Sequence, residues 1–251
     1  MAAELLALGY LAKKALDKLE DGFTDKVIGR WSRFRARRFL STFAEAVARE
    51  AHDEGGEEHV NSLLEELLSN ETKTEVMFEA YRRVLLSASK ELGPRIIALL
   101  TAQLLSENRQ ATDQEEVIFR AAESFTDQEL RSFKTQLPDP EDRYRYVRTD
   151  DGGWKYSMEH KTIKVSPIFP DSAPIGPLNL IESLGSWAPK AIQIGLMREE
   201  IVENIPRRSG SHDGEWEREF QWSVIFAGTA RRLIELIDRA AASVPDAKAS
   251  L

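Results

Sequence analysis

The spacing of apolar residues changes along this chain at Leu137-Pro138-Asp139-Pro140. Before this point, apolar residues recur at the three- and four-residue spacing of amphipathic helices. After it, aromatic and β-branched residues gather around turn signals, which is typical of strands. With 251 residues the chain can form one large domain or two small ones. We therefore expect an α+β protein, predominantly α, with a helical domain over residues 1–137.

Two short motifs predict where helices begin. Thr112-Asp-Gln-Glu115 and Thr126-Asp-Gln-Glu129 both have the order of a capping box. In this motif the Thr hydroxyl accepts from a backbone N–H three residues on, and the Glu carboxylate reaches back. The motifs predict helix starts at 113 and 127. Earlier helices are expected over residues 2–20, 25–51, 58–69, 72–90 and 95–106. Gly93-Pro94 is expected to separate the last two.

A β-hairpin and a Pro-rich linker are expected over residues 138–177. Residues 143–149 and 154–165 flank a Gly-rich turn, as in a hairpin. If residue 149 lies opposite 154, each face of the hairpin receives its own set of side chains. The first face then holds Val147, Trp154, Tyr156 and Met158, and the second holds Asp142, Tyr144, Glu159 and Lys161.

Residues 178–251 hold helix, turn, helix, hairpin and helix in that order. The expected bounds are 178–184 and 188–196 for the helices, 200–205 and 217–226 for the strands, and 227–238 for the last helix. Leu180-Ile-Glu-Ser-Leu-Gly, Ile194-Gly-Leu-Met and Gly228-Thr-Ala-Arg-Arg-Leu-Ile resemble the ends of small bacterial winged-helix domains. The resemblance covers about a third of the chain and implies a fold rather than an activity. We expect a winged-helix-like domain over 178–251.

The net charge of −8 hides a separation of charge along the sequence. The basic segment, residues 26–38, holds six Lys or Arg and no acid, whereas the acidic segment, residues 50–66, holds seven acids and no Lys or Arg. One interpretation pairs the two segments within the protein or across an oligomer interface; the other gives the basic segment an anionic ligand. The candidate binding residues are Lys26, Arg30, Trp31, Arg33, Phe34, Arg37 and Arg38, with Arg207 and Arg208 in a later loop.

The leading hypothesis is a non-enzymatic bacterial interaction or regulatory protein, with a stress or host-defence role conceivable. Its partner, a protein or a second copy, would dock on the basic segment or on the aromatic strand 216–226. A winged-helix nucleic-acid-binding protein and a protein of anionic membrane surfaces are alternatives. The expected recognition helix, 188–196, contains Lys190 but no Arg, which disfavours a groove reader.

The sequence lacks the residues that several kinds of chemistry require. Zero cysteines exclude disulfides, thiolate metal sites and cysteine nucleophiles, and favour the cytoplasm. Common nucleotide, dinucleotide, zinc-protease and serine-hydrolase motifs are absent. His52 and His59 are interpreted as part of a solvated acidic loop. Pro138-Asp139 with Glu159-His160-Lys161 leaves a Mg²⁺-dependent PD-(D/E)xK-like nuclease as a further alternative. We expect no enzyme activity, cofactor, metal or small-molecule substrate.

Overall fold

The computed structural model describes residues 30–54, 70–136, 146–149, 152–165, 179–204 and 216–242. Within these residues it holds eight helices and one four-stranded antiparallel sheet. The fold is therefore α+β and predominantly α, as the sequence predicts. The chain divides into two compact units: unit 1 is Met1–Lys134 with Arg232–Leu251, and unit 2 is Thr135–Arg231.

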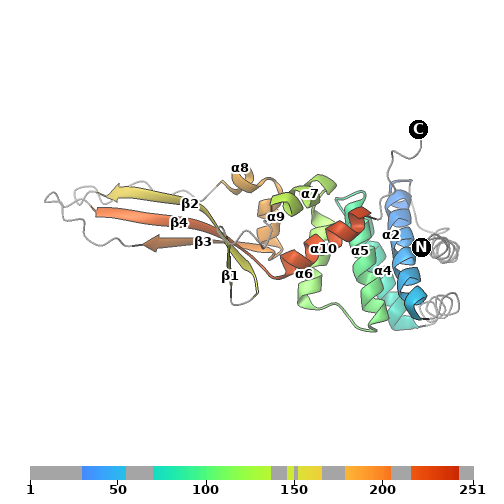
Figure 1. Cartoon of the computed structure of the whole chain (residues 1–251). Helices are drawn as coiled ribbons and strands as arrows, with labels where there is room; N and C mark the ends of the chain where they lie inside the picture. The colour runs from blue at the N-terminus through green and yellow to red at the C-terminus, as the bar shows by residue number, and fades with distance from the viewer. Residues whose placement is uncertain are drawn as a thin grey trace. The chain divides into compact units, whose positions relative to one another are not determined.

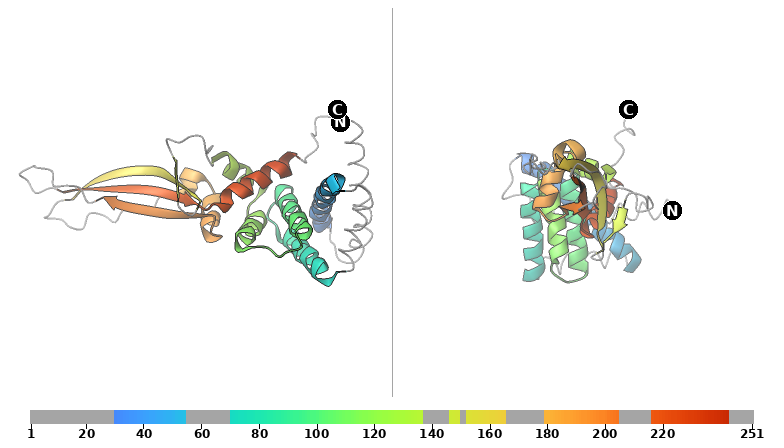
Figure 2. Two further views of the ribbon diagram at one scale, coloured as in Figure 1. Left: turned by 60° about the horizontal axis from the view of Figure 1, so that its bottom comes forward. Right: turned by 90° about the vertical axis from the view of Figure 1, so that its left-hand side faces the viewer.

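Unit 1 is built from helices. They are α2 (Arg30–Glu54), α4 (Glu71–Leu86), α5 (Leu92–Ser106), α6 (Asp113–Ser124), most of α7 (Asp127–Gln136) and most of α10 (Thr229–Ala242). Helix α5 packs against α2, α4 and α6 (Figures 1 and 2) and buries 13 of its 15 residues. A helix that is apolar on every side needs such a central position. The expected helices over 2–20 and 58–69 lie outside the described residues.

Both predicted capping boxes are present. The Thr112 hydroxyl accepts from the Glu115 N–H at 3.3 Å, and the Glu115 carboxylate accepts from the Thr112 N–H at 2.9 Å. The corresponding distances for Thr126 and Glu129 are 3.2 Å and 2.8 Å. Helices α6 and α7 therefore begin where the sequence places them.

Gly93-Pro94 does not separate two helices, because both residues lie in the first turn of α5. Proline is tolerated there, since a first-turn N–H has no acceptor within the helix. Glycine is required for a different reason. A Cβ at Gly93 would lie 2.4 Å from the carbonyl oxygen of Ala122. The chain instead breaks between α4 and α5, at residues 87–91.

The start of α5 is capped from another helix. The carboxylate of Asp127, the first residue of α7, accepts from the backbone N–H of Leu92 at 2.8 Å and of Lys90 at 3.0 Å. It also accepts from the Ser89 hydroxyl at 2.6 Å. These hydrogen bonds keep the pKa of Asp127 below its usual value, although burial acts most strongly and in the opposite direction. One side chain thus fixes the position of α7 against α5.

Unit 2 contains the sheet and two short helices. Its elements are β1 (Tyr146–Arg148), β2 (Trp154–Val165), α8 (Leu180–Leu184), α9 (Trp187–Gln193), β3 (Met197–Asn204) and β4 (Trp216–Phe226). The order helix, turn, helix, hairpin and helix is present from α8 to α10. The strand order is β1-β2-β4-β3, so the first hairpin shares one sheet with the C-terminal strands. Figure 1 shows α8 and α9 near one end of the long strands.

The predicted register of the first hairpin is wrong by one residue. Arg148, not Thr149, lies opposite Trp154. The Thr149 N–H donates to the Gly153 carbonyl at 3.0 Å, and Gly152 takes a positive φ of 80°. These contacts lengthen the turn. Val147 is therefore opposite Lys155 and lies on the other face of the hairpin from Trp154. The prediction that Val147 and Trp154 share a face is wrong.

A β-bulge changes the faces further along β2. The register shifts between Ser157 and Glu159, where one extra residue is accommodated. Glu159 then pairs with Trp222 and Lys161 with Phe220. Both partners are on the same face of β4 as Phe226, which pairs with Trp154, so Glu159 and Lys161 share the face of Trp154. The prediction that Glu159 and Lys161 occupy the opposite face from Trp154 is therefore wrong.

Aromatic residues form the core of unit 2. Trp187 is 1% exposed and its ring centroid lies 6.3 Å from that of Phe226. Its indole N–H donates to the Gln136 side chain at 2.8 Å. Phe220 and Trp222 are buried along the same strand, with centroids 6.0 Å apart. The alternating aromatic residues of β4 thus hold α9 and the sheet together.

Candidate functional site

The candidate binding residues are only partly described. Three lie outside the residues that the structure describes: Lys26, Arg207 and Arg208. The backbone of Arg30, Trp31 and Arg33 forms the start of α2. The remaining three, Phe34, Arg37 and Arg38, follow on the same helix and have described side chains. The basic segment therefore enters α2 at its N-terminal end.

An aromatic ring and a guanidinium group stack at this end of α2. Phe34 is 48% exposed, and the guanidinium carbon of Arg38 lies 5.0 Å from the centre of its ring. Arg37 is exposed beside them. Arg35 points elsewhere, because its Nη1 donates to the Leu85 carbonyl at the end of α4 at 3.2 Å. A stacked arginine and an exposed aromatic ring are residue types enriched in protein interfaces.

Helix α2 contains the end of the basic segment and the start of the acidic segment, at different positions along its length. From residue 30 to residue 44 it has no acid, and the acidic segment begins at Glu50 in the same helix. Twelve residues separate Arg38 from Glu50, which is about 18 Å along a helix axis. Ion pairs within a helix join residues three or four apart, so the helix spacing does not bring residues 50–54 next to the arginines of residues 30–38. Residues 55–66 lie outside the described part.

The other expected docking face, the aromatic strand, is buried where it is described. Phe220, Trp222 and Phe226 are at most 9% exposed. Ile201, which pairs with Trp222 from β3, is 50% exposed. Since the three rings already pack inside unit 2, the basic segment is the better candidate for a docking surface.

Helix α9 offers little positive charge to a nucleic acid. Trp187, Ala188 and Ala191 are buried in the core. Lys190 is the one basic residue of α9, and it is half-buried and already interacts with other residues. The neighbouring edge strand β3 carries Glu199 and Glu203. This charge pattern disfavours contact with phosphates at the expected recognition helix.

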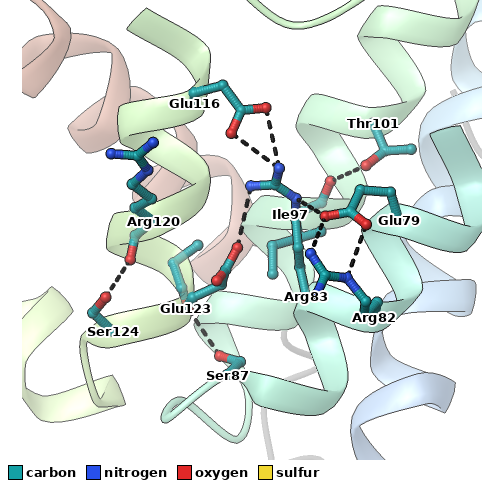
Figure 3. Close-up of polar contacts among 11 residues, drawn as sticks. Glu79, Arg82, Arg83, Ser87, Ile97, Thr101, Glu116, Arg120, Glu123 and Ser124 are labelled. Carbon is teal, nitrogen blue, oxygen red and sulfur yellow. Dashed lines mark hydrogen bonds and ion pairs between the residues drawn. The ribbon is translucent and has the colours of Figure 1, made fainter. Parts of the chain in front are cut away.

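Unit 1 also contains a cluster of ion pairs that the sequence does not predict (Figure 3). We call Arg83, Glu79, Glu116 and Glu123 the Arg83 network. The Nη2 of Arg83 donates to both carboxylate oxygens of Glu116, at 2.9 Å and 3.1 Å, and its Nη1 donates to Glu123 at 3.2 Å. Its Nε lies 3.3 Å from Glu79. One guanidinium group thus joins α4 to two turns of α6.

Three members of the Arg83 network, Glu79, Arg83 and Glu116, line a cavity of about 520 Å³ between α4, α5 and α6. The guanidinium carbon of Arg83 lies 4.6 Å from the centre of the Phe119 ring, and Phe78 is 63% exposed. Burial raises the pKa of Glu123, against the opposite effect of Arg83. Glu79 has a lowered pKa, chiefly because Arg82 donates to it. Each guanidinium nitrogen of Arg83 already contacts a carboxylate of the Arg83 network.

Sequence signals for the Arg83 network are weak. Glu79 and Arg83 are four residues apart, which is the spacing of a helix ion pair. Glu116 and Glu123 are seven residues apart, on one face of α6. Neither spacing indicates that the two helices meet, because 33 and 40 residues separate Arg83 from these partners.

The residues of the nuclease hypothesis are not assembled in the described part. Asp139 and Asp142 lie outside it, and Glu159 and Lys161 are known only by their register on β2. Across residues 30–54, 70–136, 146–149, 152–165, 179–204 and 216–242, no three His, Asp or Glu residues are grouped to hold a metal ion. His59 also lies outside these ranges.

None of the described helices combines the length and apolar character needed to cross a membrane. No protein-family model matches the sequence, and no curated protein or solved structure matches it. Function therefore has to be inferred from the residues and geometry of this chain alone.

Proposed function

We propose that this chain is a non-enzymatic, cytoplasmic interaction protein that binds an acidic protein surface through its basic segment. A second copy offers such a surface in its acidic segment, so self-association is the form of the proposal that can be tested directly. Complementary charge steers such contacts and fixes their register.

The separation of charge along α2 is the observation that carries this proposal. Arg37 and Arg38 lie near one end of the helix and Glu50 begins the acidic segment towards the other. Helix positions about 18 Å apart along the axis are too distant for an ion pair within that helix. An acidic segment from another copy can approach the basic end directly. The exposed Phe34 ring beside Arg38 adds apolar area to the same contact.

Sedimentation velocity of the full chain tests the proposal. We expect an oligomer at about 50 mM salt that dissociates at about 1 M, because exposed ion pairs are screened. Arg37→Glu and Glu54→Lys should each weaken the oligomer, since each places like charges opposite one another. The double variant Arg37→Glu/Glu54→Lys should restore it by exchanging the two signs.

Arg120→Glu is the matched control, because Arg120 is exposed on α6 and belongs to neither segment. It changes the net charge as Arg37→Glu does and should leave the oligomer unchanged. A monomer at about 50 mM salt, or equal loss in the Arg120 variant, would contradict the proposal.

Nucleic-acid binding is the second candidate, favoured by the helix, turn, helix, hairpin and helix order of α8 to α10. Because α9 carries little positive charge, we expect any such contact to lie on the basic segment instead. A mobility-shift assay at about 50 mM salt should then show affinity that falls steeply with salt and is lost in Arg33→Ala/Arg37→Ala. Absence of a shift at that salt concentration would remove this candidate.

A further inference from the structure

A second cavity of unit 1 gathers arginine side chains from two helices. It has a volume of about 270 Å³ and lies between α2, α5 and α10. Arg49 comes from α2, and Arg232 and Arg239 come from one face of α10. Glu45 and Glu107 complete its charged lining. We call this the arginine cavity; three positive and two negative side chains line it.

The two carboxylates leave the lining of the arginine cavity with one more positive than negative side chain. Glu107 accepts from the Gln103 amide at 2.8 Å and pairs with Arg109, which does not line the cavity. Although part of Glu45 faces solvent, the packing around it raises its pKa, against the opposite effects of Arg95 and Arg49. Glu45 is therefore the carboxylate that would compete with an anion for the arginines of this cavity.

The arginine groups are partly held in place and partly available. Arg232 donates from Nη2 to the Gln103 side chain at 2.5 Å and from Nη1 to Glu235 at 3.3 Å. Arg49 is exposed and makes no hydrogen bond or ion pair with the residues that the structure describes. An oriented guanidinium group beside an available one is suited to an oxyanion, which accepts several N–H donors at once.

A buried arginine next to the cavity adds to the positive charge. Arg95 is 2% exposed, and its Nη1 donates to the Ala240 carbonyl near the end of α10 at 3.5 Å. Burial lowers the pKa of Arg95, and the positive charge of Arg38 acts in the same direction. Since Arg95 also acts on Glu45, its charge lies close to the cavity lining. An anion in the cavity would offset this charge.

We infer that the arginine cavity binds a small soluble phosphate ester. Arg49, Arg232 and Arg239 supply the donors, and the volume suits a phosphate with a short organic group rather than a drug-sized ligand. Phosphate suits three arginines because its oxygens match paired guanidinium donors and its charge of up to about −2 offsets more than one of them. The site is separate from the basic segment, so the inference does not depend on self-association.

Isothermal titration calorimetry of the full chain with glycerol 3-phosphate and with inorganic phosphate tests the inference. We expect saturable binding of both, tighter for the ester, and none of glycerol. Arg49→Gln should weaken binding roughly tenfold, because a charged hydrogen bond is lost. Arg120→Gln is the matched control, since it removes the same charge from an exposed helix position outside the cavity.

A second variant separates binding from damage to the fold. Glu45→Gln removes a competing carboxylate from the cavity and should tighten glycerol 3-phosphate binding roughly threefold or more, which unfolding cannot imitate. Absence of saturable binding at about 10 mM ligand would overturn the inference. So would equal weakening by Arg120→Gln, or binding only to vesicles that contain phosphatidic acid.

Discussion

The Arg83 network and the arginine cavity lie in the same helical unit but treat charge in opposite ways. In the network, three carboxylates surround one arginine, and each lies within 3.3 Å of its guanidinium nitrogens. In the cavity, three arginines meet two carboxylates: Glu107 pairs with Arg109, which does not line the cavity, and Glu45 has a raised pKa.

This difference separates charges that hold the fold from charges that can serve a ligand. Arg83 is 14% exposed, so removing it would leave carboxylates without their partner. Arg49 is exposed, and its removal leaves no hydrogen bond broken among the described residues. Stability measurements on variants of the two regions can therefore tell a structural ion pair from a surplus charge.

The largest expected effect is for Arg83→Ala. We expect the free energy of unfolding to fall by about 3 kcal/mol, because Glu116 and Glu123 lose their partner in a partly buried position. Urea unfolding followed by circular dichroism measures this change. The matched control is Arg82→Ala in the same helix.

Arg82 also binds Glu79, at 2.7 Å and 2.9 Å, but its side chain is 60% exposed. Its removal should cost much less stability than the removal of Arg83, because exposed ion pairs are screened by solvent. Equal losses for Arg82→Ala and Arg83→Ala would show that burial does not distinguish the two arginines and would remove the basis of the comparison.

A smaller effect is expected from acid titration at the start of α6. Arg109 donates to Glu115 at 2.6 Å and 2.7 Å, and these bonds lower the pKa of Glu115 to about 2. The folded pKa is below the unfolded one, so the stabilisation is complete above about pH 4.5 and is lost as pH falls towards 2.

Glu115→Gln should remove about 1–2 kcal/mol of this acid-sensitive stability. Urea unfolding at pH values from neutral to about 3 should give a flatter dependence in the variant than in the wild type. The same slope in both proteins would mean that Arg109 does not hold Glu115 ionised in the folded state.

Local features of the fold were predictable from the sequence. Thr112-Glu115 and Thr126-Glu129 mark helix starts because each capping box forms within four residues. The order of elements from α8 to α10 also follows from local patterns. The prediction of a helix break at Gly93-Pro94 was wrong, because the glycine is needed to let the Ala122 carbonyl come close and does not mark a break.

Features that depend on distant contacts were not predictable. The bulge after Ser157 forms against β4, more than 60 residues away, and it reverses the faces of Glu159 and Lys161. The arginine cavity likewise joins α2 to α10. Arg232 and Arg239 are seven residues apart, so their common face could be read from the sequence, but their meeting with Arg49 could not.

The smallest expected effect is for Arg49→Ala. Without added phosphate, we expect the free energy of unfolding to change by no more than about 0.5 kcal/mol, because an exposed arginine without a hydrogen bond contributes little. With glycerol 3-phosphate present, the wild type should gain thermal stability and Arg49→Ala should gain less, since stabilisation by a bound ligand increases with the logarithm of its affinity. Differential scanning calorimetry with and without the ester measures both the ligand-free stability and its increase on binding. A loss near that of Arg83→Ala in ligand-free buffer would mean that Arg49, too, is a structural charge, and the two regions would no longer differ in kind.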